Sequence, residues 1–146
     1  NLKLLSGPMD GGKGIHQLPN WYHQITLDQF KNLNDNLNHR RIISSIYSKM
    51  INPKILSPKV IEQIPLSTNL RFPIFVENRK ALINFLAENQ IFVSDIWYDG
   101  PIAPPGQCPN AELASAEILN LPTHINISGL DAEKISELIN LWLKSR

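Results

Sequence analysis

The most informative stretch of the chain runs Cys108-Pro-Asn-Ala-Glu-Leu-Ala-Ser-Ala-Glu-Ile-Leu-Asn-Leu-Pro-Thr-His124. Its proline suits the first turn of a helix, and the residues that follow predict a helix over 111–119 that ends at Asn120. Residues 121–127 contain branched side chains and a second proline, which indicates a short extended segment. A helix that runs directly into an extended segment predicts a small sheet capped by helices.

The remaining segments predict the elements that complete this sheet. Apolar residues recur at helical spacing over residues 27–50, and this helix could begin as early as residue 20. The other expected elements are an extended segment at 60–64, an edge strand at 70–76, a helix at 77–89, a strand at 91–97 and a helix at 131–144. The predicted fold class is α+β, with a small, mostly antiparallel sheet covered by helices and preceded by a long connecting helix.

Composition narrows the class of protein. A chain of 146 residues with 42% hydrophobic and 18% charged residues is typical of one globular domain. The formal charge of +1 and the scattered basic residues argue against a nucleic-acid partner. No apolar run approaches the roughly 20 residues that cross a bilayer, so no membrane partner is expected. A single cysteine excludes an internal disulfide and fits a cytoplasmic protein.

The first 19 residues are rich in glycine and proline, and we expect them to be a loop-rich remnant of an upstream domain, with a short strand at residues 2–5. Gly7, Gly12 and Lys13 have the spacing of a phosphate-binding loop, but Gly14 replaces the Ser or Thr that would bind magnesium. A flexible loop is therefore the favoured interpretation. The four histidines are isolated from one another along the chain, so no metal site is predicted.

Two features could mark a site. Trp97 and Tyr98 precede a turn stiffened by three prolines, and such a loop could line a pocket or simply cover the edge of a core. Cys108 precedes a predicted helix start, but no base is identifiable beside it, and packing as a small apolar residue is the favoured role.

Four motifs in the same order resemble the DegT/DnrJ/StrS family of pyridoxal-phosphate-dependent sugar aminotransferases. The motifs are residues 18–29 with Leu33 and His39-Arg40-Arg41, residues 71–79 with Leu82, Leu86 and Ile91, Pro109 with Ala111-Glu112, and residues 119–122. The resemblance implies that residues 20–146 are the C-terminal small domain of a fold-type-I pyridoxal phosphate enzyme, including its long connecting helix.

The resemblance also implies an activity for the complete protein, in sugar biosynthesis. Such an enzyme moves an amino group from a donor, usually glutamate, to a keto-sugar nucleotide, and holds pyridoxal phosphate on a lysine. In the family, that lysine and the Asp beside the pyridine nitrogen lie upstream of the part matched here. The 146-residue chain is therefore expected to be inactive alone, without bound pyridoxal phosphate and without catalytic or cofactor-binding residues of its own.

Its expected role is to supply substrate-side walls and dimer contacts, with an upstream large domain and a second copy as partners. The candidate substrate-facing residues are Gln17, Trp97 and Tyr98. Residues 16–19 stand in the turn where the family places an Asn or an Arg-Met pair, and residues 97–105 replace a histidine-containing loop. These departures indicate an unusual acceptor or a member without activity. The alternative is a free-standing binding or assembly module of the same fold.

Overall fold

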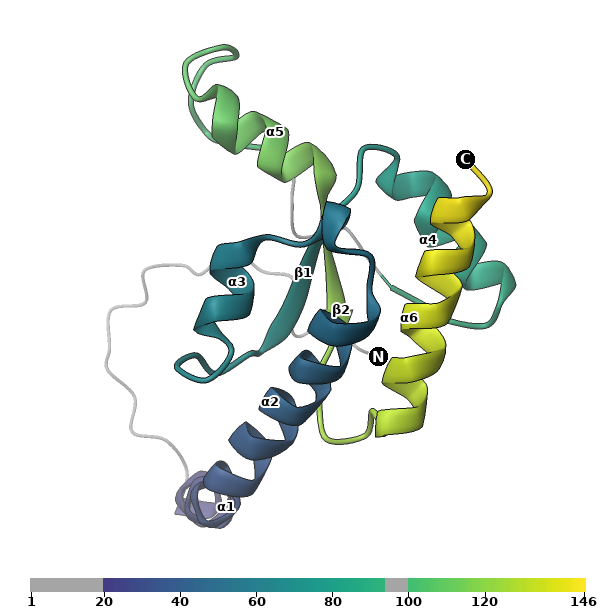
Figure 1. Cartoon of the computed structure of the whole chain (residues 1–146). Coiled ribbons are helices and arrows are strands. Elements are labelled where there is room, and N and C mark those ends of the chain that lie inside the picture. The colour runs from purple at the N-terminus through teal and green to yellow at the C-terminus, as the bar shows by residue number, and fades with distance from the viewer. Residues whose placement is uncertain (1–19, 94–99) are drawn as a thin grey trace, which may run out of the picture. The chain divides into compact units, whose positions relative to one another are not determined.

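The computed structural model describes residues 20–93 and 100–146 (Figure 1). The chain divides into two units, Asn1–Leu33 and Asn34–Arg146, which we describe separately. The predicted strands at residues 2–5 and, beyond Val93, at 91–97 fall outside the described residues. Ile91, Phe92 and Val93 themselves are not in a strand.

In place of the single long helix predicted from the sequence, the structure has α1 (Asn20–Lys31) and α2 (Leu33–Met50). The backbone N–H of Asn32 donates to Gln29 O at 3.2 Å, one residue short of the α-helical partner. The Asn32 side chain donates to Asp28 O at 3.3 Å and so occupies the carbonyl that a continuous helix would use. This local competition explains the break.

The second unit is built on a two-stranded antiparallel sheet of β1 (Arg71–Phe75) and β2 (Ile118–Pro122). Phe72 lies opposite Leu121, and Ile74 lies opposite Leu119. Because side chains alternate between the faces of a strand, these four share one face, and all are at most 1% exposed. The α+β fold and the antiparallel sheet predicted from the sequence are confirmed.

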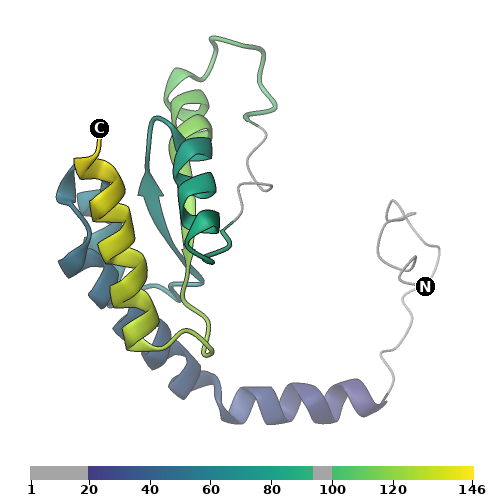
Figure 2. The ribbon, with the colours of Figure 1, turned by 90° about the vertical axis from the view of Figure 1, so that its right-hand side faces the viewer.

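Helices α2, α4 (Arg79–Glu88) and α6 (Gly129–Lys144) supply the rest of the core. Helices α4 and α6 lie side by side in both views (Figures 1 and 2). Apolar side chains at helical spacing on each helix face the sheet. The buried helix residues of this core are Ile43 and Tyr47 from α2, Leu82 and Leu86 from α4, and Ala132, Ile135, Ile139 and Trp142 from α6.

The region after α2 corrects one prediction. Residues 60–64, expected to be extended, belong mostly to the short helix α3 (Pro58–Gln63), which follows the 3-10 turn η1 (Pro53–Ile55). Pro58 occupies the first turn, where its fixed φ favours a helix and its missing N–H costs nothing. Both Val60 and Ile61 donate backbone hydrogen bonds to Ser57 O, at 3.0 and 3.2 Å.

Helix α5 (Pro109–Glu117) extends beyond the sheet in Figure 1, and none of its residues is buried. The helix predicted over 111–119 thus begins and ends two residues earlier than expected, and the extended segment begins at Ile118 rather than Leu121. The reason is pairing with β1, since Leu119 is fully buried opposite Ile74. Tertiary burial here outweighs helix propensity.

A capping box begins α6. The Ser128 hydroxyl accepts a hydrogen bond from Asp131 N at 3.1 Å, and the Asp131 carboxylate accepts from Ser128 N at 2.9 Å and from Ser128 Oγ at 2.6 Å. The hydrogen bonds that the carboxylate accepts from Ser128 hold the pKa of Asp131 below its ordinary value of 3.8. The bond from the Ser128 hydroxyl has the largest effect, and the bond from its backbone N–H has the next largest.

A pH-dependent contribution to stability follows. Because folding lowers the pKa of Asp131, its contribution is fully present above pH 3.8 and is lost as pH falls through the folded-state pKa. We expect Asp131→Asn to lower the melting temperature at neutral pH. The difference in melting temperature between the variant and the unchanged protein should become smaller as the solution is acidified. Thermal melts of both proteins across the acid range measure this difference. Glu133→Gln, on the same exposed turn, is the control, and an equal narrowing there would contradict the assignment to the capping box.

Candidate functional site

The three candidate substrate-facing residues, Gln17, Trp97 and Tyr98, lie outside the described residues, as does the glycine-rich segment with Lys13. Cys108 is described, and it corrects a prediction. Its side chain is exposed and makes no cap hydrogen bond at the start of α5, so it does not pack as an apolar residue.

Within residues 20–93 and 100–146, no three His, Cys, Asp or Glu side chains gather as a metal site, and no helix is long and apolar enough to span a bilayer.

Two of the sequence motifs meet in space. From α2, Arg40 Nη1 donates to Leu70 O at 3.0 Å and to Thr123 Oγ1 at 3.2 Å, while a ring nitrogen of His39 lies 3.3 Å from His124 O. Thr123 in turn donates to Asn69 O at 2.6 Å. The His-Arg-Arg segment and the Leu-Pro-Thr-His segment thus form one junction that fixes α2 against the end of β2.

Tyr47 completes this junction from inside the core. Its side chain is fully buried, and its hydroxyl donates to Pro122 O at 3.0 Å. Burial, reinforced by the charge of Asp131, raises the pKa of the Tyr47 hydroxyl. The hydroxyl is therefore protonated at every physiological pH and acts as a structural donor, not as an acid or base.

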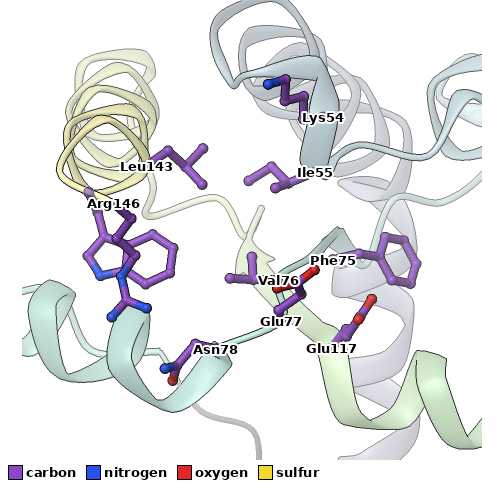
Figure 3. Close-up of a pocket in the computed structure, with 10 residues that line it drawn as sticks. Lys54, Ile55, Phe75, Val76, Glu77, Asn78, Glu117, Leu143 and Arg146 are labelled. Carbon is purple, nitrogen blue, oxygen red and sulfur yellow. The ribbon is translucent and has the colours of Figure 1, made fainter.

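A pocket lies at the other end of the sheet, where β1 ends and β2 begins (Figure 3). It has a volume of about 410 Å³ and is open to solvent on one side. We call it the Trp142 pocket. Its lining residues are Lys54 and Ile55 from η1, Phe75, Val76, Glu77 and Asn78 from the end of β1 and the turn that follows, Glu117 from α5, and Trp142, Leu143 and Arg146 from the end of the chain.

The walls of the Trp142 pocket carry charge of both signs around an apolar floor. Figure 3 shows Glu77 and Glu117 on one side, with Arg146 and Lys54 away from them. The Arg146 guanidinium carbon lies 4.2 Å from the centroid of the Trp142 ring, which is only 6% exposed. This is the geometry of a cation–π contact.

Hydrogen bonds between elements hold these walls in place. Val76 N donates to Glu117 O at 2.9 Å, which extends the β1–β2 pairing to the pocket. Arg79 Nη1 donates to Ser115 O at 2.7 Å and to Ile118 O at 2.9 Å, and so anchors the end of α5 that carries Glu117. On the opposite side, the Asn140 side chain accepts from Asn52 N at 2.9 Å and ties η1 to α6.

The lining residues support binding rather than covalent chemistry. None of them is Ser, Thr, Cys or His, so the pocket offers no hydroxyl or thiol nucleophile and no imidazole base. Sequence reasoning did not find this pocket, because its residues come from distant segments. The one available signal was the presence of Trp142 and Arg146 four residues apart at the end of the predicted last helix.

The residues of the described region do not fit a pyridoxal phosphate site. The cofactor requires a lysine that can form a Schiff base within an enclosed pocket. Every lysine in residues 20–93 and 100–146 is exposed, including Lys54, which lines the Trp142 pocket. We therefore derive no catalytic step for this region.

Comparison with known proteins gives the family. The profile of the DegT/DnrJ/EryC1/StrS aminotransferase family matches residues 16–140. The crystal structure of a DegT DnrJ EryC1 StrS aminotransferase from Brucella abortus has the same fold over 90% of this chain, with a TM-score of 0.70 and 24% sequence identity. The chain spans 40% of the length of that protein. No match was found among curated proteins. With the family profile matching most of its length, the chain belongs to the DegT/DnrJ/EryC1/StrS aminotransferase family.

Proposed function

We propose that this chain is the C-terminal small domain of a pyridoxal-phosphate-dependent aminotransferase that acts on a keto-sugar nucleotide. In this proposal the chain supplies substrate-side walls and contacts to a second copy, and the Schiff-base lysine belongs to a large domain elsewhere in the protein, which would work in the cytoplasm. The observation that carries the proposal is the family match over residues 16–140. The 40% coverage of the Brucella protein supports a longer complete protein.

The surface of α1 supports the need for a partner. Trp21, Ile25 and Phe30 are 59%, 51% and 69% exposed, and Tyr22 is also exposed. At 100° per residue these four side chains fall within one half of α1, and we call them the α1 stripe. Exposed aromatic residues in a contiguous patch are typical of an interface. We propose that the large domain covers this stripe.

Pyridoxal phosphate would supply the electron sink for amino transfer in the complete protein. The exposed lysines of the described region support a location of the reactive lysine outside that region. The part assigned to this chain is to close and shape the substrate site, consistent with a Trp142 pocket that offers no hydroxyl or thiol nucleophile and no imidazole base.

The proposal is tested by comparing the 146-residue chain with the protein that includes the coding region immediately upstream. We expect glutamate-dependent amination of a keto-sugar nucleotide only by the longer protein, detected as 2-oxoglutarate formation. A longer protein that folds, binds pyridoxal phosphate and aminates no keto-sugar nucleotide would refute the proposed substrate class. An upstream region without a pyridoxal phosphate domain would favour a free-standing binding or assembly module.

A further inference from the structure

We propose that the Trp142 pocket binds a zwitterionic α-amino acid with an apolar side chain. This inference goes beyond the proposed function and does not depend on it, because the pocket is built from residues of the second unit alone. It concerns binding only, and involves no covalent step.

Size favours a ligand of this class. Pockets for small molecules generally range from about 300 to 1,000 Å³. At about 410 Å³ the Trp142 pocket lies at the lower end, large enough for one amino acid and too small for a sugar nucleotide. Because it is open on one side, it also suits a ligand that keeps part of its polar surface in water.

The charged side chains are arranged for opposite charges on one small molecule. Glu77 and Glu117 can receive an ammonium group, and the edge of the Arg146 guanidinium can receive a carboxylate in a bidentate arrangement. The guanidinium carbon of Arg146 lies over the Trp142 ring, and a guanidinium that packs its face on an aromatic ring keeps its N–H edge available for a carboxylate. Among the described residues, none of these charged side chains is held in an ion pair.

The floor of the pocket selects the side chain of the ligand. Ile55 and Val76 are buried at the floor, and Leu143 and the Trp142 ring flank them. An apolar or aromatic side chain laid on this surface would remove apolar area from water, whereas a charged side chain would lose hydration without a partner. The hydrogen bonds around Glu117 and η1 hold these groups in place before a ligand arrives, which reduces the ordering cost of binding.

The test is a calorimetric titration of the 146-residue chain with L-phenylalanine and with two analogues that each lack one charge, phenethylamine and 3-phenylpropionate. We expect saturable binding of L-phenylalanine, and affinities about tenfold lower for each analogue, because each loses one charge-assisted contact. Absence of saturable binding by L-phenylalanine would overturn the proposal. So would equal affinity for phenethylamine, which would indicate a simple cation site.

Charge-neutralising variants assign the two ends of the ligand. Glu117→Gln should weaken L-phenylalanine binding about tenfold and leave 3-phenylpropionate binding unchanged, and Arg146→Gln should weaken L-phenylalanine and leave phenethylamine unchanged. Glu62→Gln, on exposed α3 and away from the pocket lining, is the matched control. Circular dichroism verifies that each variant is folded. Equal effects of Glu62→Gln and Glu117→Gln would place the ligand elsewhere and contradict the proposal.

Discussion

Replacement of Phe72 by alanine is expected to lower the free energy of unfolding by about 3–5 kcal/mol, the usual cost of removing a buried aromatic side chain. Phe72 is 1% exposed, and its ring centroid lies 5.4 Å from that of Tyr47. It also faces Leu121 across the sheet, so its loss opens a cavity where α2 meets both strands. Urea denaturation followed by circular dichroism measures the change.

Phe92 provides the matched control, since the same substitution is made at a side chain that is 83% exposed. Phe92→Ala is expected to change the free energy of unfolding by no more than about 0.5 kcal/mol. Similar losses for the two variants would mean that β1 is not at the centre of the core.

Substitution of the α1 stripe is expected to have little effect on the stability of the 146-residue chain and a large effect on the stability of the longer protein. In the 146-residue chain, Trp21→Ser with Phe30→Ser should change the free energy of unfolding by about 0.5 kcal/mol or less, because both side chains are exposed. The double substitution should also reduce self-association of the chain through this apolar surface. In the longer protein, where we propose that the large domain covers the stripe, each aromatic anchor should contribute about 2 kcal/mol or more.

Paired thermal melts and size-exclusion chromatography of the two proteins measure this difference. Gln24→Ser with Lys31→Ser, on the opposite side of α1, is the control and should affect neither protein. Equal stability of the longer protein with and without Trp21 and Phe30 would show that the stripe is not its domain interface.

The elements with strong local signals were predicted well from the sequence. Helix α6 was expected at 131–144 and spans Gly129–Lys144, and β1 was expected at 70–76 and spans Arg71–Phe75. Both have a clear hydrophobic period that matches their burial. The predictions failed where contact with a distant segment, or a hydrogen bond from a single side chain, determines the backbone conformation. Pairing with β1 makes Ile118 and Leu119 extended, and the Asn32 amide ends α1.

The candidate site was less predictable than the fold. The family motifs were found in the sequence. The structure shows that Arg40, from the first motif, donates a hydrogen bond to Thr123, which directly follows the last motif, over a separation of 83 residues. The Trp142 pocket could not be predicted, because Glu77, Glu117 and Arg146 carry no shared motif and meet only through the sheet and the end of α6. The proposed substrate-facing role of Gln17, Trp97 and Tyr98 stays a prediction.

In the proposed function, the reactive lysine of the enzyme lies outside these 146 residues. The direct measurement adds pyridoxal phosphate to the purified chain and to the longer protein, reduces any Schiff base with borohydride, and locates the modified lysine by peptide mass spectrometry. We predict one stoichiometric modification in the longer protein, at a lysine upstream of this chain, and only trace, unselective labelling of the short chain. Stoichiometric, selective labelling of Lys13 or any other lysine in the short chain would show that the reactive lysine lies within these 146 residues.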